Sequence, residues 1–84
     1  MRYYIKDVDK ILGFTTWDNK KKIDELLRID TMMYAAEGMD STKEDRDRLR
    51  VDSRRIYLAI KEIDSDLGSS FLGLMDEADS TESH

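Results

Sequence analysis

The sequence predicts an all-α protein, an antiparallel helical hairpin with a short N-terminal helix, assembling as a homo-oligomer. The 84-residue chain contains no proline and only four glycines, and 39% of its residues are charged. Residues that favour helix, such as Leu, Lys, Glu, Arg, Met and Ala, are frequent. The length suits one small domain, and a parallel sheet would need more chain for its crossover helices.

Two N-terminal segments carry apolar residues at helical spacing. From residue 3 to residue 12 the spacing is that of a short amphipathic helix, and Gly13 follows where this helix would end. Thr15 or Thr16 is placed to cap a second helix, expected over residues 17–37. The apolar stripe of this second helix contains Leu26, Ile29, Met33 and Ala36.

A third and longer helix is expected over residues 42–66. Gly38 ends the preceding helix, and Ser41 with Glu44 has the spacing of a capping box. A short Gly38–Asp40 turn then predicts that the second and third helices pack antiparallel. The apolar line of the third helix has heptad spacing with one serine in it, in the order Leu49, Ser53, Ile56, Ile60, Ile63 and Leu67.

The C-terminal part is expected to contain little structure. Gly68 is predicted to stop the third helix, and residues 70–75 to form one last short helix. The helical domain would therefore span residues 1–75. Residues 76–84 consist mainly of Asp, Glu, Ser and Thr, and they are expected to form an acidic disordered tail.

Two features concern what the hairpin has to bury or satisfy. Asp30 lies inside the apolar stripe of the second helix, and we expect it to pair with an arginine of the third helix. Two helices of this length also bury little apolar surface. Self-association would cover the apolar residues that lie off the main stripe, namely Met32, Val51, Tyr57 and Leu58.

The composition disfavours several classes of function. Cysteine is absent and the one histidine is His84, so thiolate metal sites and histidine-dependent catalysis have no ligands or base. We therefore expect no enzyme activity, no cofactor and no metal. No apolar run reaches the length of a membrane span, and Asp7 interrupts any signal-peptide core, so a cytoplasmic location is expected.

The charge is distributed unevenly along the chain. All 14 Lys and Arg residues lie within residues 1–63, whereas residues 64–84 carry acidic groups and no Lys or Arg. The net charge of −5 argues against general binding to DNA or RNA. A local basic pocket remains compatible with this distribution.

Arginines of the third helix form the densest cluster of cations. Arg46, Arg50 and Arg54 are four residues apart and share a face, with Arg55 and Tyr57 close by. Guanidinium groups bind phosphate with two parallel hydrogen bonds, and a tyrosine ring can stack on a base. Interleaved aspartates give the alternative of a solvated face with internal ion pairs.

A second set of candidates lies nearer the N-terminus. Lys20, Lys21 and Lys22 fall in the first turns of the second helix, either as an anion site or as a solubilising run. Tyr3 and Tyr4 are adjacent, so one can be a stacking platform while the other packs on the hairpin. Trp17 is interpreted as a packing anchor.

Residues 38–63 read Gly-Met-Asp-Ser-Thr-Lys-Glu…Arg-Ile-Tyr-Leu-Ala-Ile-Lys-Glu-Ile, with an aliphatic–aromatic pair at Ile56-Tyr57 and Ala59 after it. This segment resembles the second half of the helical hairpin of the phage anti-CBASS sponge proteins. The preceding helix with Ile23-Asp24-Glu25-Leu26 and the aromatic N-terminal segment follow in the same order. The resemblance covers roughly three quarters of the chain.

This resemblance implies an oligomer that sequesters cyclic oligonucleotide messengers without cleaving them, which would block antiviral signalling in the host cytosol. Tyr3 or Tyr4 would stack on a base of a cyclic dinucleotide or trinucleotide. A cation of the following helix would bind phosphate, and the candidates are Lys20, Lys21, Lys22 and Arg28. For a second pocket near the end of the long helix, Arg55 and Lys61 are the nearest bases.

The residues chosen as candidate ligand contacts are Tyr3, Tyr4, Lys20, Lys21, Lys22, Arg28, Arg54, Arg55 and Tyr57. A different hypothesis stands beside nucleotide binding. A small phage-type helical protein could bind and inhibit a host protein through its apolar and acidic surfaces.

Overall fold

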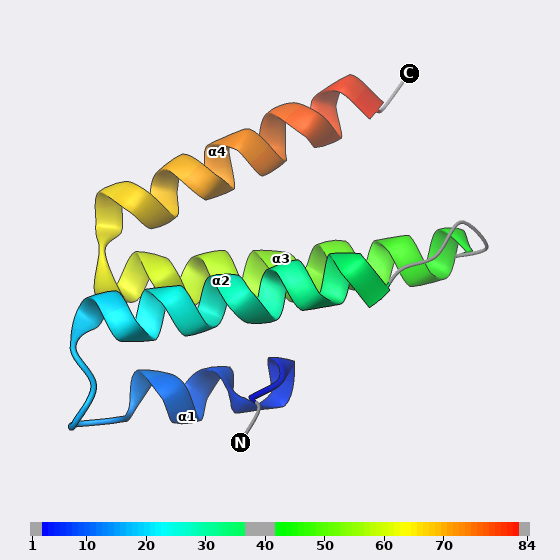
Figure 1. Ribbon diagram of the computed structural model, residues 1–84. Helices are drawn as coiled ribbons and strands as arrows, with labels where there is room; N and C mark the ends of the chain where they lie inside the picture. Colours follow the sequence, from blue (N-terminus) through cyan, green and yellow to red (C-terminus); the bar gives the residue numbers. More distant parts are fainter. Residues whose placement is uncertain (1–2, 37–41, 83–84) are drawn as a thin grey trace.

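A computed structural model describes residues 3–36 and 42–82 of the chain, and every regular element in these ranges is helical (Figure 1). The prediction of an all-α fold is confirmed. A short 3-10 turn η1 precedes four α-helices. The elements are η1 Ile5–Asp7, α1 Val8–Leu12, α2 Asn19–Ala36, α3 Lys43–Ile63 and α4 Ser65–Glu82.

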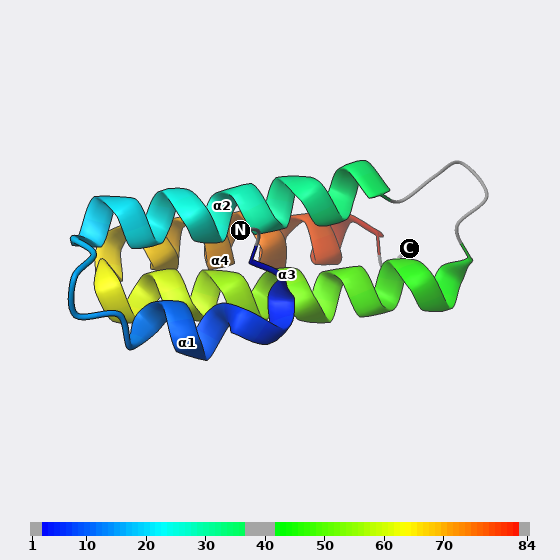
Figure 2. The same ribbon diagram turned by 60° about the horizontal axis from the view of Figure 1, so that its bottom comes forward.

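The helices form three layers. Helices α2 and α3 run side by side in opposite directions, α1 covers one side of this pair, and α4 lies on the other (Figures 1 and 2). The segment between α2 and α3 lies in 37–41, outside the described residues. Helix α4 packs chiefly on α3, and α1 contacts both α2 and α3.

The core lies between α1, α2 and α3. Its fully covered side chains include Leu26 and Ile29 of α2 and Ile56 and Ile60 of α3, as the apolar spacing predicts. Helix α1 adds Val8 and Ile11, which are 1% and 0% exposed. Met33, Ile63 and Leu67 pack partly buried around these residues.

The helix caps lie one to three residues later than the sequence predicts, and each uses an aspartate. Thr42, not Ser41, is the N-cap of α3. Its hydroxyl accepts from the Asp45 N–H at 3.1 Å, and the Asp45 carboxylate accepts from the Thr42 N–H at 3.2 Å. At α2 the Asp18 carboxylate accepts from the Lys21 N–H at 2.8 Å, in place of Thr15 or Thr16. A carboxylate also interacts more favourably than a hydroxyl with the positive helix N-terminus.

The C-terminal region differs most from expectation. Helix α3 ends at Ile63, Asp64 is extended with φ −139° and ψ 100°, and α4 then continues to Glu82. The prediction of a break at Gly68, of a short helix at 70–75 and of disorder from residue 76 is therefore wrong for the described part. Residues 83–84 lie outside it. Packing on α3, with an Asp76–Arg54 ion pair of 3.1 Å, stabilises a helix that the acidic composition alone disfavours.

Gly68 is needed for close packing and does not end a helix. It is buried within α4, and a Cβ atom added there would lie 2.3 Å from the Lys61 Cα atom. Gly73, five residues further along the same helix, has open space where its Cβ would be. The two glycines therefore have different physical roles.

None of the described helices is both long enough and apolar enough to cross a membrane.

We expect Gly68→Ala and Gly73→Ala to change stability in opposite directions. Gly68→Ala forces α4 away from α3, and overpacking of this kind costs roughly 1–3 kcal/mol. Gly73→Ala should raise the unfolding free energy by about 0.5–1 kcal/mol, because alanine favours helix over glycine. Urea unfolding followed by circular dichroism measures both. Equal effects of the two substitutions would contradict the close α3–α4 contact.

Candidate functional site

A buried polar cluster joins α2 to α3. The Asp30 carboxylate accepts from the Ser53 hydroxyl at 2.7 Å and from the Tyr57 hydroxyl at 2.8 Å. Asp30 is 8% exposed and Ser53 is fully buried. The prediction that Asp30 pairs with an arginine of the third helix is therefore wrong. The serine that interrupts the heptad line provides one of these two donors, and an apolar residue in its place would remove one hydrogen bond from the buried carboxylate.

Tyr57 links this cluster to α4. Its ring stacks on Phe71 with centroids 5.1 Å apart and an interplanar angle of 15°. Burial of the phenol, together with its position beside Asp30, raises the pKa of Tyr57 to about 12. The side chain thus stays a neutral donor, and Phe71 covers one face of its ring.

Aromatic residues gather around the N-terminal segment. Tyr3 meets Phe14 and Trp17 edge-on at 5.7 and 5.6 Å, and Phe14 lies 4.8 Å from Trp17 between centroids. The Lys21 ammonium lies 4.5 Å from the Trp17 ring centroid, within cation–π range. Tyr3 is therefore partly buried, whereas Tyr4 is 46% exposed.

Cations of α2 attach this segment to the bundle. The Lys22 ammonium donates to the Leu12 carbonyl at 3.0 Å, at the end of α1. Arg28 donates to the Tyr3 carbonyl at 3.1 Å from Nη2 and to Glu25 at 2.8 Å from Nε. The hydrogen bond with Glu25 raises the pKa of the Arg28 guanidinium above its ordinary value. Two of the predicted phosphate ligands thus contact backbone carbonyls of the N-terminal segment.

The arginines of α3 point to different neighbours. Arg54 pairs with Asp76 of α4 at 3.1 Å, and Arg55 pairs with Asp9 of α1 at 3.6 Å. These two side chains therefore reach the two outer layers on opposite sides of the α2–α3 pair. The structure does not bring Arg54, Arg55 and Tyr57 together into one pocket within a single chain.

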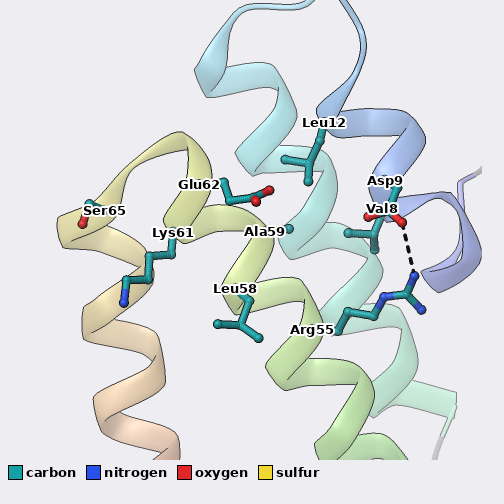
Figure 3. Close-up of a pocket in the computed structure, with 9 residues that line it drawn as sticks. All are labelled: Val8, Asp9, Leu12, Arg55, Leu58, Ala59, Lys61, Glu62 and Ser65. Carbon is teal, nitrogen blue, oxygen red and sulfur yellow. Dashed lines mark ion pairs between the residues drawn. The ribbon is translucent and has the colours of Figure 1, made fainter.

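A groove between α1 and α3, which we call the α1–α3 groove, has a volume of about 580 Å³ (Figure 3). Its apolar part includes Leu58, which is 47% exposed, and its rim carries both signs of charge. Figure 3 shows Arg55 reaching toward Asp9, while Lys61 points away from both. The lining residues are Val8, Asp9, Leu12, Arg55, Leu58, Ala59, Lys61, Glu62 and Ser65.

The sequence predictions did not identify this groove as a whole. It forms where α1 meets the last turns of α3, so residues far apart in the chain line it. Lys20 lies elsewhere, on a recess of about 450 Å³ formed by the start of α2 and the α3–α4 junction. Among the side chains that the structure describes, in residues 3–36 and 42–77, no three of His, Cys, Asp or Glu are grouped so that they could bind a metal.

Comparison of the chain with protein-family models, with curated proteins and with solved structures gives no match.

The raised pKa of Tyr57 predicts a loss of stability at high pH. A folded-state pKa of about 12 exceeds the ordinary 10.0, so the protonated phenol stabilises the fold fully below pH 10 and less as the pH rises toward 12. We expect the unfolding free energy of wild type to fall over this range more steeply than that of Tyr57→Phe. Tyr4→Phe, at a tyrosine of the N-terminal segment that is 46% exposed, is the control and should behave like wild type. If the unfolding free energies of Tyr57→Phe and wild type fall equally with pH, the raised pKa of Tyr57 is contradicted.

Proposed function

We propose that this chain is a non-enzymatic binding protein that sequesters cyclic oligonucleotides as a homo-oligomer. The observation that carries the proposal is an exposed tyrosine whose neighbour in the chain is contacted by an arginine. Tyr4 is 46% exposed, and the Arg28 guanidinium donates to the carbonyl of the adjacent Tyr3. An exposed aromatic ring and a planar cation that meet the same short segment suit a nucleotide, which offers a base to stack and a phosphate to bind.

Arg28 retains capacity for a further anion. A guanidinium has five N–H donors, and the contacts with Glu25 and Tyr3 use Nε and Nη2. Among the described residues, its Nη1 atom contacts the Met32 sulfur, 4.0 Å away, which is a weak acceptor. A phosphate oxygen is a much stronger acceptor for the same donors. The side chain is 38% exposed, so such an oxygen can reach it.

Self-association completes the proposed site. A cyclic dinucleotide has two bases and two phosphates, and one chain presents one Tyr4–Arg28 pair. Exposed apolar residues support an oligomer, because Val51, Leu58 and Leu74 are 67%, 47% and 63% exposed. Sequestration needs only tight binding, so it requires no catalytic group, and the expected location is the cytosol in which such messengers act.

We expect Tyr4→Ser to abolish the thermal stabilisation that cyclic dinucleotides or trinucleotides give to the wild-type protein. A ligand at one hundred times its Kd stabilises the folded state by about 2.7 kcal/mol, which a thermal melt detects. Tyr34→Ser is a matched control, because Tyr34 is 48% exposed and lies near the C-terminal end of α2.

The same melts should include Arg28→Gln, which removes the charge but keeps a polar side chain. Full ligand-induced stabilisation of a folded Tyr4→Ser variant would overturn the proposed site. No stabilisation of wild type by any cyclic nucleotide in the panel would overturn the proposed function.

A second candidate function is binding to a protein partner, and α4 favours it. This helix contains no Lys or Arg between Ser65 and Glu82, and its acidic residues accompany the 63% exposed Leu74. An acidic helix with an exposed apolar residue is suited to a basic partner with a complementary apolar contact.

This second function predicts that Leu74→Ser weakens capture of the partner in affinity purification from host lysate, whereas Val51→Ser does not. Val51 is similarly exposed but lies on α3. Binding should also weaken with added salt, because it depends on the charge of α4. Unchanged capture by Leu74→Ser at all salt concentrations would contradict a role for this surface.

A further inference from the structure

The junction between α3 and α4 is a single residue, Asp64. It is extended, and neither glycine nor proline stands beside it. No described residue of the chain has a positive φ, so no special backbone conformation fixes the bend. The apolar spacing of the sequence predicts a helix that continues beyond this point. The Asp64 carboxylate caps α4 by accepting from the Leu67 N–H at 3.1 Å, which favours the bend. No glycine, proline or positive φ requires the bend, so the local sequence is also compatible with a straight helix through residue 64.

Tertiary contacts hold α4 back against α3. Gly68 packs on the Lys61 backbone, Phe71 stacks on Tyr57, and Asp76 pairs with Arg54. Each contact joins one residue of α3 to one residue of α4. Nothing in their chemistry requires that the two residues belong to the same copy of the chain.

These contacts are placed symmetrically about the junction. Moving away from residues 64 and 65, residue 61 meets 68, residue 57 meets 71, and residue 54 meets 76. Two straight helices from two copies, running antiparallel and crossing at this junction, would bring the Tyr57–Phe71 and Arg54–Asp76 pairs together again. The two-fold axis would pass through the junction.

We propose that α4 is exchanged between two copies of this chain. In the exchanged dimer, residues 43–82 of each copy form one continuous helix, and α4 of each copy lies on α3 of the other. Exchange of an identical element costs little free energy, because the α3–α4 contacts of the single chain are made again between two copies and only the hinge at Asp64 changes. The proposal rests on the self-association part of the proposed function and not on nucleotide binding.

A charge-complementation experiment tests the exchange directly. Arg54→Glu alone places two carboxylates at the α3–α4 contact, and Asp76→Arg alone places two guanidinium groups there. The two variants are unfolded, mixed and refolded together. In an exchanged heterodimer, one contact then joins the introduced glutamate to the introduced arginine, and the other restores the natural Arg54–Asp76 pair. A chain that keeps its own α4 leaves both contacts repulsive.

We expect native mass spectrometry of the mixture to show more heterodimer than random pairing gives, with a higher melting temperature than either variant alone. Wild type mixed with an isotope-labelled copy of itself is the control and should pair at random. Random pairing of the two variants would overturn the proposal, and so would a wild-type protein that is monomeric at every concentration.

Ser65→Pro gives a second and independent measurement. Ser65 is the first residue of α4, where proline is tolerated, and extended backbone suits the residue before a proline. A straight helix would be broken at this position, because the ring clashes with the carbonyl four residues earlier. We expect this variant to keep its helical circular dichroism and to lose the exchanged dimer in light scattering.

A Ser65→Pro variant that has the wild-type mass would overturn the exchange. It would leave self-association through another surface intact, and nucleotide binding is measured separately through Tyr4→Ser. The outcomes for the exchange and for the proposed function therefore remain distinguishable.

Discussion

The buried carboxylate of Asp30 constrains the packing of three helices. A charge at this depth is strongly destabilising unless hydrogen bonds satisfy it, and the Ser53 and Tyr57 hydroxyls do so at 2.7 and 2.8 Å. These bonds fix how far α2 can slide along α3, because a shift by one residue would remove both donors from the carboxylate. The same Tyr57 ring stacks on Phe71, so the position of α4 also depends on the hydroxyl that Asp30 orients. The polar cluster thus connects two helix interfaces that apolar packing alone would leave less specific.

Cations in this chain act first as structural links. Lys22 and Arg28 donate to backbone carbonyls at the two ends of the N-terminal element, Arg54 reaches α4, and Arg55 reaches α1. A basic cluster in the sequence therefore becomes a set of contacts that point to different layers. A ligand site built from these side chains has to use N–H donors that these structural contacts do not already engage. Arg28 provides such donors, because among the described residues its Nη1 atom contacts a sulfur, which is a weak acceptor.

Helical spacing predicted the faces of the helices but not the partners of individual side chains. Leu26, Ile29, Ile56 and Ile60 are buried as expected, because the period of the apolar residues determines which face turns inward. The partner of Asp30 could not be derived in this way, since arginine, serine and tyrosine can all donate to a carboxylate. Gly68 resembled a helix stop because the sequence does not show that another backbone approaches it. The sequence could predict only part of the candidate site for the same reason. The contact of Arg28 with Tyr3 and the α1–α3 groove both join segments that are far apart in the chain.

At the α3–α4 junction the chain bends where the apolar spacing of the sequence predicts a continuous helix. This difference between the predicted and the observed structure carries physical information. Natural sequences usually favour locally the structure that they adopt globally, and a mismatch marks a place where tertiary contacts override local preference. Here the bend is imposed mainly by the packing of α4 on α3, together with the Asp64 carboxylate that caps α4. The core is also small, with seven buried apolar residues among those described, so the free energy that favours one arrangement over another is limited. Contacts between α3 and α4 can be satisfied equally well when the two helices belong to two copies of the chain. Our inference of exchange follows from this combination of a one-residue hinge without glycine or proline, symmetric contacts and a small core.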